Sequence, residues 1–179
     1  PGQRPRTISV TDVDRLKADP FAFYAKAILR LRALDALDID PTAAWKGTAV
    51  HDVLESWFKH DGCDPAALIP RAEALLGGET VHPLVRTLWQ PRLLEAVAWV
   101  SARVSEDAGR GRRQVLSECE GSAELSGVLV KGKADRIDRL ADGGSAIVDY
   151  KTGHAPKSGA IDAGFALQLG LLGLIAEAG

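Results

Sequence analysis

The sequence predicts a mixed α/β domain in which a small sheet is covered by helices. Two segments, residues 128–138 and 145–151, place β-branched and apolar residues between polar ones, which is the pattern of β-strands. The stretch between them, residues 140–144, contains an aspartate followed by two glycines and predicts a tight turn. Long stretches before this hairpin, and one after it, repeat apolar residues at helical spacing. The predicted elements follow one another in the order helices, strand, hairpin and closing helix. This order indicates an α+β or mixed α/β architecture.

The composition indicates one globular domain. A chain of 179 residues is long enough to bury a full-sized core. The formal net charge is -2, so any surface that binds nucleic acid must be local. The sequence starts at a proline and contains no methionine, and we therefore expect a piece of a longer protein. Within it we expect a linker at residues 1–7, a mainly helical part at 8–109, and the sheet core with its closing helix at 110–179.

The sequence also predicts a cytoplasmic location. It has no N-terminal signal pattern, and the apolar run at residues 163–176 is too short to span a bilayer. The two cysteines, Cys63 and Cys119, lack the spacing of metal ligands and are expected to stay reduced. No association with a membrane is expected.

The first part of the chain is predicted to form helices. Ser9 or Thr11 can cap a helix that begins near residue 12 and ends before Pro20. A second helix is expected over residues 21–31, followed by a polar crossing over residues 34–43.

The next helix, predicted over residues 45–60, places His51 and Glu55 on one face. Two interpretations are open for this face. It can bind a metal ion or a phosphate, or it can hold a partly buried histidine bonded to its glutamate, which is the more common arrangement.

Further helices are expected between residues 61 and 108. Asp64 followed by Pro65 is a helix start, Gly77 followed by Gly78 is a stop, and residues 91–105 form a periodic apolar helix. Residues 114–125 predict a strand. The last helix, residues 162–178, is apolar nearly all round and is expected to be buried, which requires a partner for Gln168.

Basic residues near the predicted sheet are candidates for holding a nucleic-acid backbone, although a solvated loop also explains the run at residues 110–113. The candidate residues are Arg110, Arg112, Arg113, Lys131, Lys133 and Lys157.

The geometry of the predicted hairpin brings charged groups together. A three-residue loop places Gly143 in the left-handed conformation, and counting back from it places Asp135 opposite Asp149. Lys151 lies two residues beyond Asp149 and shares its face. Opposed carboxylates repel, and a cation such as Mg²⁺ between them relieves the repulsion. The adjacent lysine can then orient a water molecule or steady charge on a phosphoryl group. The alternative is a surface hairpin with one salt bridge.

Several segments, taken in order, resemble a known family. Residues 47–51, 132–135, 149–151 and 168–169 resemble the successive motifs of RecB-type nucleases in the PD-(D/E)XK superfamily. Residues 8–24 resemble the segment that precedes the histidine motif in AddB-type proteins. The resemblance implies a restriction-endonuclease-like core. It also implies the C-terminal nuclease domain of a helicase–nuclease subunit that processes double-strand DNA breaks.

The resemblance assigns roles to individual residues. His51, Asp135 and Asp149 would bind a metal ion together with the carbonyl of Tyr150, and Lys151 would be the catalytic lysine. Gln168 would support the lysine or the DNA strand, and Glu55 would support His51.

Two positions depart from the family pattern. Asp19 stands where many AddB-type proteins have a cysteine of an iron–sulfur cluster, and Leu172 replaces a tyrosine. With only two cysteines at unrelated positions, we expect no iron–sulfur cluster.

The leading hypothesis is therefore a deoxyribonuclease, an exonuclease that depends on Mg²⁺ or Mn²⁺ and works with an AddA-like helicase–nuclease partner on DNA ends. The alternatives are a DNA-binding module that retains the nuclease shape without activity, and a purely structural domain.

Overall fold

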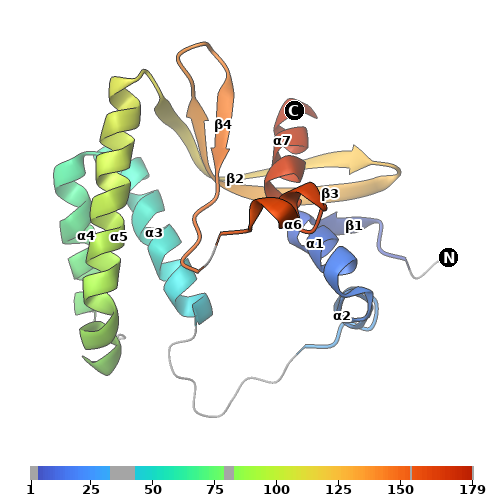
Figure 1. The fold of residues 1–179 in the computed structure, drawn as a ribbon. Coiled ribbons are helices and arrows are strands. Elements are labelled where there is room, and N and C mark those ends of the chain that lie inside the picture. The colour runs from blue at the N-terminus through green and yellow to red at the C-terminus, as the bar shows by residue number, and fades with distance from the viewer. Residues whose placement is uncertain (1–3, 33–42, 79–82, 154, 179) are drawn as a thin grey trace.

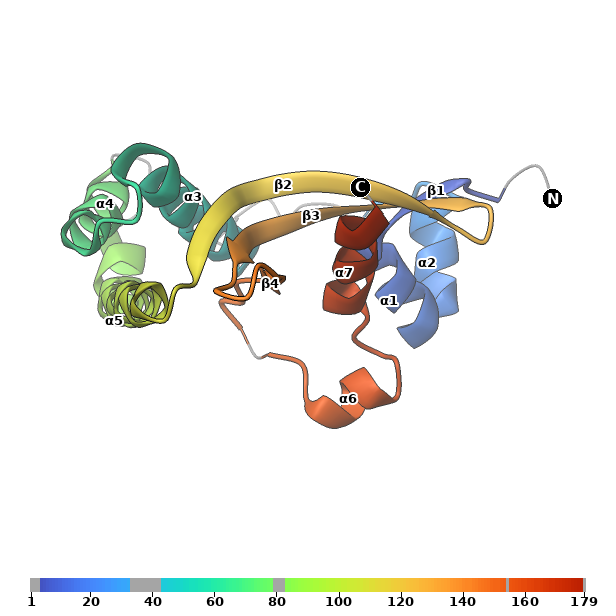
Figure 2. The same ribbon diagram turned by 90° about the horizontal axis from the view of Figure 1, so that it is seen from above.

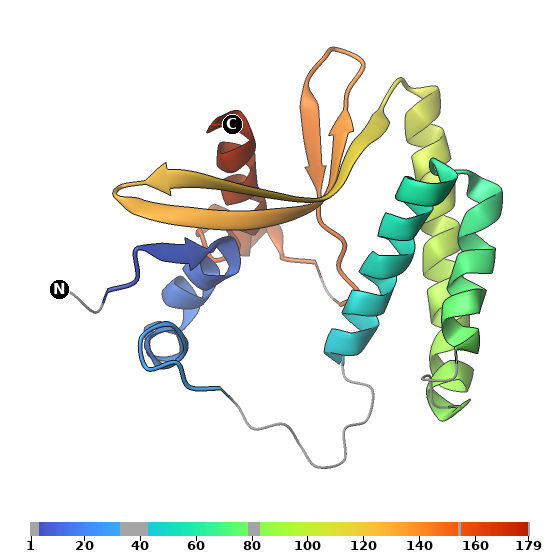
Figure 3. The same cartoon turned by 180° about the vertical axis from the view of Figure 1, so that it is seen from behind.

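The computed structural model describes residues 4–32, 43–78, 83–153 and 155–178. Its centre is a long, curved pair of antiparallel strands, β2 (Arg113–Leu125) and β3 (Val128–Arg139). Figures 1 and 3 show helices α3, α4 and α5 at one end of this pair and α1, α2 and α7 near the other. The fold is thus a mixed α/β arrangement with a small mixed sheet flanked by helices, which confirms the predicted class. None of the helices in the described ranges combines the length and the apolarity that crossing a bilayer requires.

The sheet has two further strands, both paired with β3. Strand β4 (Ser145–Val148) is antiparallel to it, and the loop between them has the predicted form, because Leu140 N donates to Gly144 O at 2.9 Å and Gly143 has φ 87°. Strand β4 ends at Val148, three residues earlier than predicted. Strand β1 (Thr7–Ser9) runs parallel to β3 and was not predicted.

Local capping explains the first two helices. Helix α1 (Val10–Ala18) begins after Ser9, whose side chain accepts from Asp12 N at 3.1 Å. Helix α2 (Pro20–Ala27) is capped by Asp19, whose side chain accepts from the backbone N–H groups of Phe21 and Ala22. It ends four residues before the predicted boundary, and Arg30 lies beyond it in the left-handed conformation with φ 57°.

Three helices form the first hydrophobic core: α3 (Ala43–Asp61), α4 (Pro65–Gly77) and α5 (Pro83–Gly109). Trp57, Leu68 and Leu93 are buried at its centre. The predicted start of α5 at Pro91 is wrong, because Pro91 lies inside the helix on an exposed position where its ring meets solvent. The polar crossing predicted over residues 34–43 lies outside the described residues, except that Ala43 already begins α3.

The C-terminal part differs from the single buried helix that was predicted. A short helix α6 (Ser158–Asp162) is separated from α7 (Gln168–Ala178) by a segment in which Gly164 has φ 71°. Leu167 N donates to Asp14 Oδ1 at 2.7 Å, and this bond fixes the start of α7 against α1. Helix α7 is buried only on one face, because Leu169 and Leu174 are each 49% exposed. His154, in the predicted loop before α6, lies outside the described residues.

The second hydrophobic core joins both ends of the chain on the sheet. It consists of Val10, Ala123, Val130, Leu172 and Ile175. Glycines on the strands allow the close approach of α7: a Cβ added at Gly132 would lie 2.5 Å from Leu172 Cδ2, and one at Gly121 would lie 2.7 Å from Ile175 Cγ2. The packing of α7 on the sheet also carries Gln168 to the edge of the candidate site.

Candidate metal centre

The candidate site lies where α3 meets the central strands. His51 from α3, Glu118 from β2 and Asp135 from β3 each offer a ligand atom, and these atoms lie within 4.8 Å of one another. His51 Nδ1 is 3.2 Å from Glu118 Oε1 and 3.4 Å from Asp135 Oδ1. An imidazole and two carboxylates form a ligand set suited to a divalent cation.

Glu118 occupies an unusual backbone position. Its φ is 51° within strand β2, and such a conformation costs about 1–3 kcal/mol for a residue other than glycine. Glu118 lies opposite Asp135 in the hairpin. This follows from the flanking pairs, which are Ser117 with Arg136 and Cys119 with Ala134. The strain is thus stored at a point where two carboxylates face each other.

Glu118 lies within the strand predicted over residues 114–125 and was not among the predicted site residues. A signal was available in the turn at residues 126 and 127, where Ser126 and Gly127 have φ 51° and 78°. A two-residue turn of this type fixes the register of the hairpin. Counting back from it pairs Leu125 with Val128 and brings Glu118 opposite Asp135.

Asp135 is buried, with 8% of its surface exposed. Burial raises the pKa of its carboxyl group, and the backbone N–H of Tyr150 and the charge of His51 offset part of this effect. Tyr150 N donates to Asp135 Oδ2 at 2.7 Å. One oxygen of Asp135 is therefore held by the backbone, and the other faces His51.

His51 is surrounded by acceptors. Its Nε2 is 3.2 Å from Tyr150 O, while Nδ1 faces the two carboxylates. A neutral imidazole has one N–H, so it leaves one nitrogen lone pair facing an oxygen. A second proton or a metal ion removes this conflict. Glu55, which was expected to support His51, forms an ion pair with Lys59 instead.

A second group of residues adjoins this centre. Lys151 Nζ lies 2.6 Å from Asp149 Oδ2 and donates to Gln168 Oε1 at 3.2 Å. Gln168 Nε2 donates to Asp149 Oδ1 at 2.7 Å. The three side chains form a closed ring of interactions beside the metal-ligand candidates. The side chain of Lys151 is 41% exposed, so its ammonium group remains accessible to a bound molecule.

A buried ionic network supports the side chain of Tyr150. Asp138, with 0% exposure, accepts from Arg136 Nε and Nη2 at 2.6 and 2.7 Å. It also accepts from Arg112 Nε at 2.6 Å. Arg136 Nη1 in turn donates to the hydroxyl of Tyr150 at 3.4 Å. The network fixes the side chain of the residue whose backbone contacts both His51 and Asp135.

The basic residues predicted to bind DNA differ in whether their side chains form ion pairs within the domain. Arg112 is partly exposed and pairs with Asp107 and with the buried Asp138, so its charge is engaged within the domain. Arg110 pairs with Glu106, and Lys133 pairs with Glu118 Oε2 at 2.6 Å, a contact that raises the pKa of Lys133. The exposed side chains among these candidates that form no ion pair with the described residues are those of Arg113, Lys131 and Lys157.

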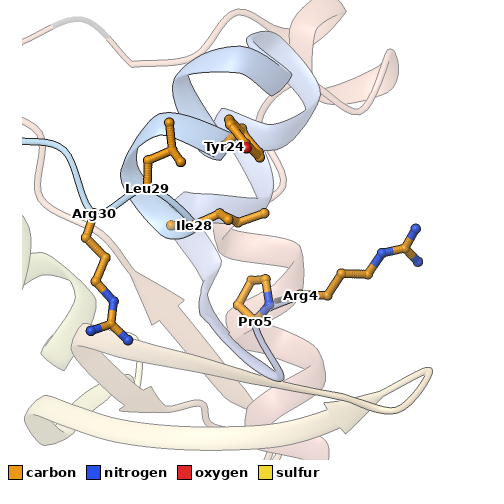
Figure 4. Close-up of a pocket in the computed structure, with 7 residues that line it drawn as sticks. Arg4, Pro5, Tyr24, Ile28, Leu29 and Arg30 are labelled. Carbon is orange, nitrogen blue, oxygen red and sulfur yellow. The ribbon is translucent and has the colours of Figure 1, made fainter. Parts of the chain in front are cut away.

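A separate hollow of about 500 Å³ lies beside α2, away from this site. Figure 4 shows Tyr24 and Ile28 on its wall, while the guanidinium groups of Arg4 and Arg30 point in different directions. The two cations therefore do not converge on a common ligand.

Comparisons with known proteins match almost the whole chain. Residues 7–179 match the sequence profile of the PD-(D/E)XK nuclease superfamily. An uncharacterized protein of Rickettsia bellii (strain RML369-C) is 30% identical over 92% of this chain and 21% of its own length. A second such protein, of Rickettsia felis, is also 30% identical, with the same coverage.

A further relative, from Streptococcus mutans, is named as one subunit of an ATP-dependent helicase/deoxyribonuclease. It is 30% identical over 85% of this chain and 14% of its own length. The chain thus spans about a fifth or less of the curated relatives it matches.

Proposed function

This chain belongs to the PD-(D/E)XK nuclease superfamily, and from that membership we propose that it is a metal-dependent deoxyribonuclease domain acting on DNA ends. One observation carries the proposal: His51, Glu118 and Asp135 bring their ligand atoms within 4.8 Å of one another, directly beside the ring formed by Lys151, Asp149 and Gln168.

The residues of the centre fit a divalent cation such as Mg²⁺ or Mn²⁺. The acceptors around His51 outnumber the protons of a neutral ring, and burial raises the pKa of the Asp135 carboxyl group although the Tyr150 N–H and His51 offset part of this effect. The proposed ligands are His51, Glu118 and Asp135, and the Tyr150 carbonyl and Asp149 complete the set expected from the family. When bound, the ion would stabilise charge on the phosphate and make a water molecule more acidic.

The other residues position the reacting groups. Asp149 and Gln168 hold the ammonium group of Lys151, whose exposed end can stabilise negative charge on a phosphoryl oxygen or orient the attacking water. The Tyr150 N–H holds one oxygen of Asp135, so this carboxylate keeps a fixed orientation while it binds.

The larger assembly is also a proposal. The relative in Streptococcus mutans is named as part of a helicase/deoxyribonuclease. We assign the same setting to this chain: the nuclease domain of an AddB-like protein, in the cytoplasm, with an AddA-like partner that delivers DNA ends for recombinational repair. Exonuclease action on a delivered end fits this setting.

The test is cleavage of labelled linear DNA by the purified chain with Mg²⁺, Mn²⁺ or a chelator. We expect products only with a divalent cation, and thermal stabilisation by about 2.7 kcal/mol at a hundredfold excess of metal over its Kd. DNA binding without metal-dependent cleavage would instead favour a non-catalytic module. Absence of cleavage, DNA binding and metal stabilisation together would leave only a structural role.

The role of Glu118 can be tested separately. Replacing it with glutamine keeps its size and removes its charge, so we expect metal affinity to fall by about 10–100-fold. Calorimetric titration with Mn²⁺ measures this change. Glu120→Gln is the matched control, because Glu120 is an exposed carboxylate on the same strand. Equal affinities in the two variants would exclude Glu118 from the ligand set.

A further inference from the structure

A cavity of about 750 Å³ opens beside Lys151, the proposed catalytic lysine. Its walls are formed by α5, α3 and the segment that follows β4. Figure 1 shows that segment descending beside α3, and Figure 2 shows it on the side of the sheet where α5 lies. Asp149, Tyr150 and Lys151 line one side, and Trp99 and Val100 line the other. A molecule in this cavity would therefore contact α5 and the site residues at the same time.

Trp99 is unusually exposed for a tryptophan. Its exposed fraction is 68%, whereas those of Trp57 and Trp89 are 1% and 9%. An aromatic face left open beside a catalytic centre can stack against a nucleic-acid base, and such stacking tolerates any base because every base has a π-face.

Two arginines flank Trp99 along the same face of α5. Arg92 and Arg103 lie seven residues before and four residues after it, spacings that return to the same side of a helix. Both line the cavity. Arg92 is exposed and forms no ion pair with the described residues, and Arg103 contacts Glu106 and Asp107 at the helix surface with 48% of its side chain exposed.

Arg92, Arg103 and Lys151 are the cationic side chains of the cavity that lie outside the buried Asp138 network. Arg112 and Arg136 also line the cavity, but both are paired with Asp138. The opposing carboxylates are Glu95, on the α5 side, Asp107, which is buried beside Arg103 and Arg112, and Asp149, which belongs to the catalytic group. The cation that remains without an ion pair among the described residues is Arg92, and the exposed ends of Arg103 and Lys151 lie on the same cavity, so positive groups are available to a phosphate backbone.

From these contacts we infer that this cavity binds single-stranded nucleic acid, with an unpaired base stacked on Trp99 and phosphates held by Arg92 and Arg103. The inference rests on the proposed nuclease function and names the form of its substrate. Within a duplex the faces of a paired base are covered by the neighbouring pairs, so the interior of a duplex cannot stack on Trp99. The strand would run from α5 toward Lys151, which places the stacked base close to the scissile phosphate.

The test measures binding of a thymidine homo-oligonucleotide in a chelator, where no metal-dependent cleavage takes place. We expect tryptophan fluorescence to be quenched on binding, and Trp99→Ala to weaken binding by about tenfold or more. Trp99→Phe keeps an aromatic ring and should retain most of the affinity. Leu88→Ala is the matched control, because Leu88 is 75% exposed on the same helix and does not line the cavity.

A blunt duplex of equal length should bind more weakly and should not respond to Trp99→Ala. Replacing Arg92 with glutamine should lower the slope of log affinity against log salt by about one. Unchanged strand affinity in Trp99→Ala, or a duplex that binds as tightly as the strand and responds equally, would overturn the inference. Cleavage by the wild type with Mn²⁺ is scored independently, so loss of that activity counts against the proposed function alone.

Discussion

Asp135→Asn is expected to reduce metal-dependent cleavage by about 10³-fold or more while making the metal-free protein more stable at neutral pH. Loss of a charged ligand removes several kcal/mol of charge stabilisation from the reaction, and roughly 4 kcal/mol corresponds to this factor. Stability changes in the opposite direction, because burial raises the pKa of this carboxyl group and so disfavours its charged form in the folded chain. Asparagine keeps an oxygen that can accept the N–H of Tyr150.

The pH dependence follows from the direction of that pKa shift. The folded protein holds the Asp135 proton more tightly than the unfolded chain, so the wild type is relatively most stable below the ordinary carboxyl pKa. Its stability falls as the pH rises through the raised pKa of the folded state. The advantage of the asparagine variant should therefore be absent at low pH, grow through this window, and stay constant above it.

Thermal melts across pH in a chelator, and cleavage rates with Mn²⁺, measure the two effects. Asp52→Asn is the control, because Asp52 is exposed on α3 next to His51. A variant of Asp135 that loses stability without metal and keeps its cleavage rate would show that this carboxylate only maintains the fold.

Asp138→Ala is expected to destabilise the domain by about 3–5 kcal/mol, because it leaves the buried guanidinium group of Arg136 without its carboxylate and removes one partner of the partly exposed Arg112. Domains of this size are stable by only about 5–15 kcal/mol in total. The change should thus lower the midpoint of urea unfolding strongly. The variant should also lose activity, because Arg136 and Tyr150 are fixed through this network.

The exposed turn residue Asp142 supplies the matched control. Asp142→Asn keeps an acceptor for the N–H of Gly144 and should change the free energy of unfolding by less than about 0.5 kcal/mol. Asp138→Asn keeps the shape of the buried side chain and removes only its charge. If this variant loses less than about 1 kcal/mol, the network contributes little net stability and the expected loss in Asp138→Ala comes from packing.

The parts of the fold that are determined by residues close together in the sequence could be predicted from the sequence. The hairpin of β3 and β4, with Gly143 in its loop, follows from a turn signal and a register count. The caps at Ser9 and Asp64 follow from the side chains themselves. In each case the determining interaction spans a few residues, so the sequence contains it directly.

Features that depend on distant contacts could not be predicted. Strand β1 is too short to show alternation and exists because it pairs with β3 at Leu129 to Lys131. Helix α5 continues through the Pro91 position because packing against α3 and α4 outweighs the local preference.

At the candidate site, Asp135, Asp149 and Lys151 could be placed by counting along the hairpin. The contact of Glu118 with His51 required the position of α3 against the sheet, which no local pattern encodes.

The two hydrophobic cores differ in how much of the chain must exist before each can form. The buried members of the first lie between Ala49 and Val104 in the described part of the chain, although Tyr150 packs against them, so α3, α4 and α5 can associate before β4 is made. The second needs Val10 and Ile175 together, and closing so long a loop is entropically costly and slow. Strand β1 and α1 are synthesised before α7 and remain uncovered on that side until α7 packs against them.

The two groups of site residues, the candidate ligands and the ring around Lys151, are also completed at different times during synthesis. His51, Glu118 and Asp135 are all synthesised before β4, whereas the ring around Lys151 closes only when α7 delivers Gln168. A nascent chain would therefore contain these three candidate ligands before Lys151 is held in place, and the proposed site would be complete only after α7 has packed on the sheet.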